Sequence, residues 1–173
     1  INCRILGNQD TIYTGAKFTR LYFKDCYIDG TTDFIFGPST ALFENCMIHS
    51  KRNSYVTAAS TPKEAKYGYI FKHCKLTAEP GVDKVYLGRP WRPYAYTLFI
   101  ECELGKHIVP AGWHNWGKQS NEETARYMEY KNTGEGANVS ERVAWSKQLT
   151  KKEAEAVTVD AIFGTQSNWN PID

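Results

Sequence analysis

Two aspartates occupy equivalent positions after a recurring cysteine, and this spacing could bring them together for acid–base chemistry. Asp10 lies seven residues after Cys3, and Asp33 lies seven residues after Cys26. If successive repeats stack in register, the two carboxylates lie one strand spacing, about 4.8 Å, apart. Carboxylates at that separation cannot both ionise freely, so one pKa rises and the pair can supply both a nucleophile and an acid/base.

The residues beside both aspartates fit this chemistry. Gln9 precedes Asp10 and offers an uncharged amide donor. Asp33 is followed by the apolar run Phe34–Phe36, and a carboxylate in apolar surroundings is costly unless it is paired. We therefore expect a cation beside Asp33.

Arg89 is the candidate for this cation. It lies 13 residues before Cys102, just as Asp33 lies 13 residues before Cys46, so we expect both on the same side of the stack. Arginine is always charged and can hold a carboxylate in its ionised form. The alternative for both aspartates is a structural role at corners of the repeat, since Asp favours turns.

The cysteines belong to a repeated phrase that predicts the fold. Each cysteine is followed two residues later by Ile or Leu, and four of the five are preceded three residues earlier by Phe. The copies read INCRI, FKDCYI, FENCMI, FKHCKL and FIECEL. A phrase that recurs every 20 to 28 residues is typical of stacked-coil architectures.

The pattern inside each copy predicts one coil of a parallel β-helix. Side-chain alternation places each cysteine and the following Ile or Leu on one face of a strand. The alternation breaks just before each cysteine, which indicates a corner between two short strands. Because the number of cysteines is odd and no Cys-x-x-Cys pair occurs, we expect stacked, buried free thiols. Cys26 and Cys46 lie one coil apart, which leaves a disulfide between them open.

Composition predicts a single folded domain. The chain has 173 residues, 42% hydrophobic and 14% aromatic residues, and a net charge of +2. No basic cluster indicates nucleic acid, and neither a membrane-spanning run nor a signal peptide is recognisable. The sequence opens inside a repeat, at INCRILG, so we expect a longer parent protein that supplies missing N-terminal coils.

A change of composition after the PAGWHNWG stretch predicts the end of the coils. We expect residues 1–116 to form the coils that carry the active-site cleft. Residues 117–173 are expected to form a C-terminal tail packed on them within the same domain. In this tail, Thr150 and Glu153 have the spacing of a capping box, and an apolar stripe follows, which predicts one short helix that ends at Gly164.

Several phrases together resemble those of a known family. GNQDTIY, DGTTDFIFG, YLGRPW and PAGWHNW resemble the successive motifs of pectin methylesterases, and the closing TVDAIFGTQSNWNP is similar to the end of that family. The resemblance implies an all-β, right-handed parallel β-helix. It also implies hydrolysis of the methyl esters of pectin homogalacturonan by an aspartate nucleophile, with release of methanol. Methyl-esterified pectin would be the partner, and neither a cofactor nor a metal would be needed.

The resemblance also assigns roles to individual residues. The nucleophile maps to Asp33, the acid/base to Asp10, an oxyanion-stabilising glutamine to Gln9, and the arginine that contacts the nucleophile and substrate to Arg89. The aromatic residues matched to the sugar-binding cleft are Trp91, Tyr13, Phe36 and Trp113. Trp116 is left open between cleft and core.

The resemblance further implies a monomer that is secreted, extracellular or periplasmic. The family carries earlier motifs, including a second oxyanion glutamine, and these are absent from this sequence. We therefore expect this piece alone to be inactive or weakly active.

Two other functions compete with the esterase. A non-catalytic pectin- or polysaccharide-binding β-helix would keep the aromatic residues and lose the acids, but both carboxylates are present. A lyase of the pectate-lyase type would hold calcium in a carboxylate cluster, which the sequence does not indicate. The sequence contains no G-x-S-x-G motif, which would indicate a serine esterase.

Overall fold

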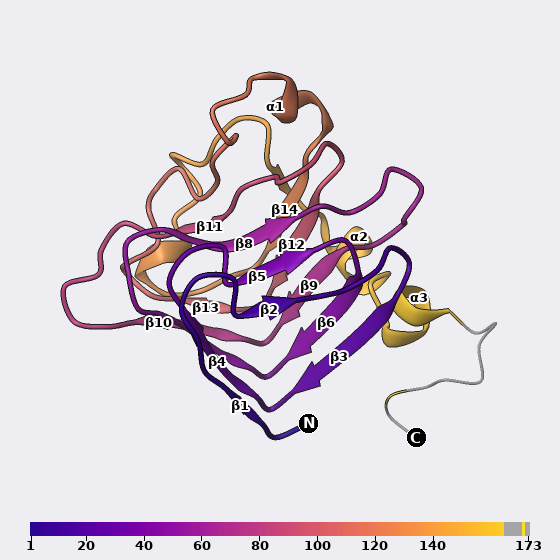
Figure 1. The fold of residues 1–173 in the computed structure, drawn as a ribbon. Coiled ribbons are helices and arrows are strands. Elements are labelled where there is room, and N and C mark those ends of the chain that lie inside the picture. Colours follow the sequence, from indigo (N-terminus) through magenta and orange to yellow (C-terminus); the bar gives the residue numbers. More distant parts are fainter. Residues whose placement is uncertain (165–170, 172–173) are drawn as a thin grey trace.

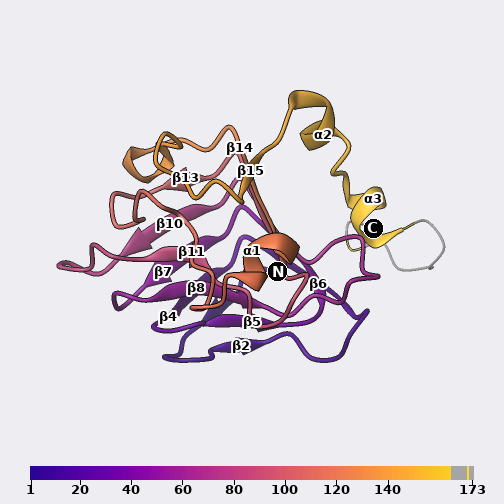
Figure 2. The same ribbon diagram turned by 90° about the horizontal axis from the view of Figure 1, so that it is seen from above.

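The chain winds into a solenoid of stacked coils, and each full coil adds one strand to each of three parallel sheets (Figure 1). The computed structural model describes residues 1–164 and 171. All strand pairs in the three sheets are parallel, which confirms the predicted parallel β-helix. Figure 2 shows the coils as successive layers.

In the sequence, each strand of the first sheet begins directly after one of the cysteines. Its five strands are β1 (Arg4–Ile5), β4 (Tyr27–Gly30), β7 (Met47–Ser50), β10 (Lys75–Ala78) and β13 (Glu103–Leu104). The Ile or Leu two residues after each cysteine is paired with its counterpart in the next coil, so Ile28 stands opposite Ile48, and Leu76 opposite Leu104. Each copy of the repeated phrase therefore marks one strand of this sheet, and hence one coil.

The second sheet runs beside the residues that the sequence predicts for the site. In the sequence, the strands of the third sheet that belong to the repeated phrase come just before the cysteines. The four strands of the second sheet are β2 (Ile12–Tyr13), β5 (Ile35–Gly37), β8 (Tyr55–Ala59) and β11 (Tyr86–Gly88). The six strands of the third sheet are β3 (Arg20–Lys24), β6 (Thr40–Glu44), β9 (Tyr69–Lys72), β12 (Tyr96–Ile100), β14 (Arg126–Tyr130) and β15 (Lys147–Gln148).

The predicted corner before each cysteine is a single residue in the left-handed backbone region. The polar residue at this place has a φ angle between 51° and 55° in every copy. These corner residues are Asn2, Asp25, Asn45, His73 and Glu101. Asn and Asp tolerate this conformation better than other side chains, because they can hydrogen-bond locally. The corner turns the chain from the third sheet into the first.

Ladders of identical residues fill the core. The four Phe rings of the repeat stack with centroid separations of 4.4–4.7 Å, and the later four cysteines are buried behind them. Burial of one such Phe side chain contributes roughly 1.5–3 kcal/mol. All five cysteines are free thiols, and Cys3 is exposed. The disulfide between Cys26 and Cys46 that the sequence left open is not formed.

The predicted end of the coils at residue 116 is wrong, because the solenoid continues beyond it. The strand β14 pairs with β12 over five residues, and β15 pairs with β14. This part of the chain also contains the short helix α1 (Ser120–Thr124) and the 3-10 turn η1 (Glu135–Ala137). The last coils lack both the Phe and the Cys of the phrase, so the repeat cannot be seen in the sequence there.

The single helix predicted from Thr150 to Gly164 is two helices, α2 (Lys151–Glu155) and α3 (Val159–Phe163). The capping box of Thr150 and Glu153 is formed as predicted. A second cap interrupts the helix, because the side chain of Thr158 accepts the N–H of Ala161. The β-branched residues around Thr158 also disfavour a continuous helix.

Both helices lie outside the coils (Figure 2) and pack on the third sheet in a second apolar cluster. This matches the expected packing of the tail. Part of the closing phrase, residues 165–170, lies outside the described residues. No helix in the described part of the chain is long and apolar enough to cross a membrane.

Candidate active site

A cavity of about 240 Å³ opens on the second sheet, where β2, β5, β8 and β11 lie side by side. Seven of its eight lining residues are polar, charged or aromatic. The full lining is Gln9, Asp10, Asp33, Phe36, Ala58, Arg89, Trp91 and Trp116. Six of the residues expected at the site from the sequence are thus brought together.

The two aspartates lie at equivalent positions on adjacent coils. Ile12 in β2 is paired with Ile35 in β5, and Asp10 and Asp33 each stand two residues before these partners. Both aspartates have positive φ angles, 57° and 50°. The N–H of Asp33 donates to the carbonyl of Tyr55 on the next coil at 2.9 Å. The register predicted from the cysteine spacing is confirmed.

Asp33 is buried and forms a two-point ion pair with the half-buried Arg89. Asp33 is only 6% exposed, and the Nε and Nη2 atoms of Arg89 donate to its two carboxylate oxygens at 3.0 and 2.8 Å. Burial raises the pKa of Asp33 above its ordinary value, the hydrogen bonds and charge of Arg89 oppose that rise, and the charge of Asp10 adds to it. Asp10 itself is exposed. The two carboxylates therefore have different surroundings, as separate chemical roles require.

Arg89 reaches Asp33 from a different level than the spacing predicted. Gly88 in β11 is paired with Thr57 in β8, and Thr57 is paired with Ile35 in β5. Arg89, the residue after Gly88, is therefore in register with Phe36 and not with Asp33. Loops of unequal length break the simple count, and the long arginine side chain spans the difference. A Cβ on Gly88 would lie 2.1 Å from the hydroxyl of Thr57, so glycine is needed for this close approach.

The guanidinium of Arg89 is held between two aromatic rings. Its central carbon lies 3.9 Å from the ring centroid of Tyr55 and 3.8 Å from that of Trp116. Cation–π contacts on both faces fix the plane of the fork that holds Asp33. The sequence reasoning missed Tyr55 and left Trp116 undecided. Tyr55 lies in β8, the strand between β5 and β11, a position that only the structure shows.

His114 contacts the residues that hold Arg89. Its Nδ1 accepts the backbone N–H of Trp116 at 3.0 Å, and its ring packs against Tyr55 and Tyr86. Burial lowers the pKa of His114, and the charge of Arg89 lowers it further. A neutral His114 therefore orients Trp116 without adding a second positive charge next to Arg89.

The aromatic residues predicted for the cleft divide into two groups. Tyr13, Phe36 and Trp91 form a row, with ring centroids 5.0 Å apart for the first pair and 5.8 Å apart for the second. Trp113 is a correction, because it is only 1% exposed and stacks on Tyr127 at 4.3 Å in the core. Its indole N–H is directed at a buried carboxylate, and Trp116 takes the place at the cavity.

A polar clamp holds the turn that carries Gln9 and Asp10. The N–H of Gly7 donates to the carboxylate of Asp29 at 3.0 Å, and the ammonium of Lys51 donates to the carbonyl of Gly7 at 2.5 Å. Lys51 and Asp29 also form an ion pair at 3.5 Å. Asp29 is a buried residue of β4, and the strand that carries it fixes the turn.

No three His, Cys, Asp or Glu side chains in the described part of the chain are grouped so that they could hold a metal ion. The groups at the cavity are a buried carboxylate held by arginine, an exposed carboxylate one coil away, an amide donor, and aromatic faces. Such a set can supply a nucleophile, an acid/base and an oxyanion donor.

The fold and the cavity together define a parallel β-helix protein with a carboxylate pair in an aromatic cleft. The family model described as Pectinesterase matches residues 1–166 of this chain. The chain therefore belongs to the pectinesterase family.

Three relatives illustrate the match. Pectinesterase 31 of Arabidopsis thaliana is 44% identical over 154 residues, which cover 88% of this chain and 48% of that protein. The pectin methylesterase from carrot has a TM-score of 0.87 at 34% identity, covering 93% of this chain and 55% of that one. A pectin methylesterase in complex with a hexasaccharide has a TM-score of 0.77 at 28% identity, covering 97% and 57%. The chain spans about half the length of these relatives.

Proposed function

We propose that this chain is the catalytic part of an enzyme that hydrolyses the methyl esters of pectin homogalacturonan and releases methanol. The observation that carries the proposal is the buried Asp33 carboxylate, held at two points by Arg89 and placed one coil from Asp10. Membership of the pectinesterase family supports this substrate class, and the relative solved with a hexasaccharide supports a carbohydrate chain in the cleft.

The residues divide the reaction between them. The ionised carboxylate of Asp33 attacks the ester carbonyl, while Arg89 maintains its charge. The amide of Gln9 donates to the developing oxyanion, and one such donor is worth about 10²–10³ in rate. Protonated Asp10 gives its proton to the departing methanol, and an anhydride joins Asp33 to the galacturonate unit. Asp10 then takes a proton from water, which hydrolyses the anhydride and frees Asp33.

The remaining expectations from the sequence belong to the same proposal. The enzyme works as a monomer outside the cell or in the periplasm, and uses neither a metal nor a cofactor. Because the chain spans about half the length of its relatives, experiments on activity use the full-length protein.

The test is methanol release from methyl-esterified pectin by full-length variants. Asp33→Asn is expected to abolish release, and Asp10→Asn to lower it by about 10²–10⁴, the usual contribution of general acid–base catalysis. Asp25→Asn is the matched control, because Asp25 is exposed and has a φ angle of 54°, close to the 57° of Asp10. The control removes a carboxylate from the same backbone conformation away from the cavity.

Two results would contradict the proposal. Methanol release that survives both Asp33→Asn and Asp10→Asn would show that these carboxylates do not carry the reaction. A parent protein that binds pectin and releases no methanol would favour the non-catalytic binding function.

A further inference from the structure

Trp116 has a strained backbone that the surrounding chain must hold in place. Its φ angle is 63°, and that of the following Gly117 is 67°, so two successive residues are left-handed. Glycine adopts this region freely, whereas a bulky side chain does so only where its surroundings enforce it. The ring of Trp116 lies 3.8 Å from the guanidinium of Arg89. The contacts that fix this turn therefore also fix a contact of Arg89.

Asn115 supplies several of these contacts. Its side-chain oxygen accepts the N–H of Gly117 at 2.8 Å, and its side-chain amide donates to Oε1 of Glu122 at 2.7 Å. Its backbone carbonyl accepts from the side-chain amide of Asn121 at 2.9 Å. Asn121 and Glu122 both belong to α1, and Asn121 is buried. Asn115 thus joins the turn to this helix.

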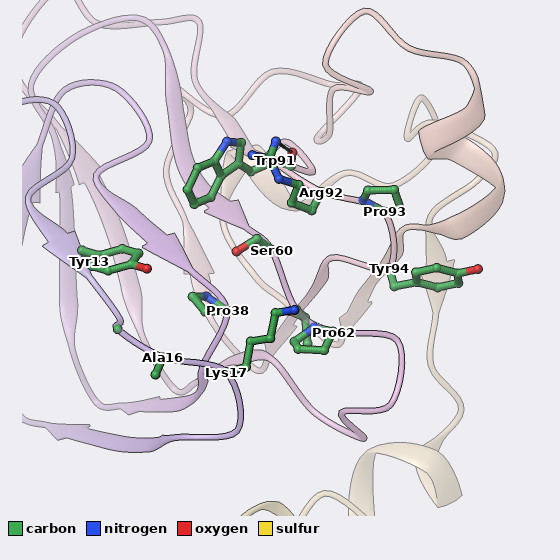
Figure 3. A pocket seen from close by; sticks show the side chains of 12 residues that line it. Tyr13, Ala16, Lys17, Pro38, Ser60, Pro62, Trp91, Arg92, Pro93 and Tyr94 are labelled. Atoms are coloured by element: carbon green, nitrogen blue, oxygen red, sulfur yellow. Dashed lines mark hydrogen bonds between the residues drawn. The ribbon is translucent and has the colours of Figure 1, made fainter.

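Glu122 acts on the turn from outside the candidate active site. The helix α1 lies outside the three sheets (Figure 1), and Glu122 and Asn115 line neither the cavity at Asp33 nor the larger hollow that shares Trp91 with it. That hollow has a volume of about 570 Å³ (Figure 3), and its lining residues include Lys17, Pro62 and Arg92. An effect of Glu122 on the reaction is therefore transmitted through the turn at Trp116.

We infer that Glu122 is a positioning residue for the reaction at Asp33. This inference rests on the proposed function and deepens it. Glu122 holds the side chain of Asn115, which fixes the turn that carries Trp116. The Trp116 ring then holds the guanidinium of Arg89 in the plane in which it pairs with Asp33.

The consequence of this role is a change in the pH dependence of the reaction. Burial raises the pKa of Asp33, Arg89 lowers it, and the charge of Asp10 raises it. The other titratable groups nearby are Tyr127, on which the charge of Asp33 acts, and His114, on which that of Arg89 acts. A loosened Arg89 leaves the pKa of Asp33 higher, so less of this carboxylate is ionised at a given pH. The acid limb of the pH–rate profile should then move to higher pH.

The test is kcat/KM for methanol release across pH with full-length variants. Glu122→Ala should move the acid limb to higher pH and lower kcat/KM on that limb by about two- to thirtyfold, the scale of changes within a coupled network. Glu122→Gln keeps an acceptor for Asn115 and should retain the profile of the unaltered enzyme. Asn115→Ser keeps an oxygen for the N–H of Gly117 but cannot reach Glu122, so it should move the limb as Glu122→Ala does.

Glu123→Ala is the matched control, because Glu123 is the exposed neighbour of Glu122 in the same helix. It should leave the acid limb in place. In the Arg89→Gln background, Glu122→Ala should cause no further shift, because both residues act through one chain of contacts. A destabilised but correctly arranged protein would lower activity at every pH without moving the limb.

The inference is overturned if Glu122→Ala and Asn115→Ser leave the acid limb where it is. An equal shift in Glu123→Ala, or an additive shift in the Arg89→Gln background, also overturns it. In these cases the unaltered enzyme still releases methanol, and the proposed function stands. A full-length protein that releases no methanol defeats the proposed function, and the inference with it.

Discussion

The guanidinium of Arg89 contacts three groups at once, the carboxylate of Asp33 and the rings of Tyr55 and Trp116. The aromatic rings hold the plane of the guanidinium, and that plane fixes the direction of both hydrogen bonds. A lysine could supply the charge at this position but not the two-point geometry. The reactivity of one carboxylate thus depends on residues from three other coils.

The first prediction concerns Arg89→Gln. Arg89 opposes the rise in the pKa of Asp33 that burial and Asp10 cause, so its removal raises that pKa further. A smaller fraction of Asp33 is then ionised at any given pH, and the acid limb of the pH–rate profile should move to higher pH. Methanol release at neutral pH should fall by about 10²-fold, the scale of one lost electrostatic stabiliser.

The measurement is kcat/KM for methanol release across pH, with Arg52→Gln as the control for loss of a surface arginine. An unchanged acid limb in Arg89→Gln, with activity lowered at every pH, would mean that Arg89 does not set the ionisation of Asp33.

At the scale of the elements, the corners decide where each strand ends. Asn and Asp occupy the earlier corners, whereas His73 and Glu101 occupy the later ones with the same left-handed backbone. Side chains that cannot hydrogen-bond locally in this conformation cost of order 1 kcal/mol. The later corners are therefore held by the stacked strands on either side more than by their own residue type.

The second prediction follows for Glu101→Asn. The change should stabilise the fold by about 0.5–1 kcal/mol, because Asn adopts the left-handed region more readily. The exposed pair that Glu101 forms with His73 at 3.6 Å contributes little and its loss should not offset the gain. Urea unfolding measures the difference. Glu103→Asn, in the adjacent strand β13, is the control and should not stabilise; equal gains at both positions would contradict the corner explanation.

At the scale of the whole molecule, the core ends in a buried ion pair instead of another Phe. Glu129 in β14 is paired with Phe99, so it occupies the next position of the Phe ladder. Its carboxylate is 1% exposed and accepts from the Nε of Arg142 at 2.8 Å and from the indole N–H of Trp113 at 3.4 Å. The pair ties the loop that carries Arg142 to the last coil of the core.

The third prediction concerns this pair. Arg142→Met leaves a buried carboxylate without its cation and should lower the free energy of unfolding by about 3–5 kcal/mol. The double variant Glu129→Leu with Arg142→Met should recover most of that loss, because an apolar pair of similar size needs no solvation. Both are measured by urea unfolding. A double variant as unstable as Arg142→Met alone would show that the pair does more than satisfy a buried charge.

The sequence alone was sufficient for the coils that carry the cysteine phrase and for the carboxylate pair, because the two aspartates lie at the same distance after their cysteines. It also predicted the pairing of Arg89 with Asp33, which is confirmed, but not the level in the stack from which Arg89 reaches Asp33, since loops of different length separate β8 from β11. The last coils were missed because Glu129 and Asn132 stand where Phe and Cys would mark a repeat. Trp113 was misplaced because its phrase does not reveal which side chain faces the core; only the packing against Tyr127 does.

The unequal loops have a further consequence for how such a protein can diverge. The coil between Cys26 and Cys46 is shorter than the next one, yet β4, β7 and β10 keep a continuous register. Residues can therefore be inserted, lost or exchanged between the strands without disturbing the stack that holds Asp33. Lys17, Pro62 and Arg92 all lie in such connections. Descendants of one ancestor can thus carry different loops while inheriting the same stack.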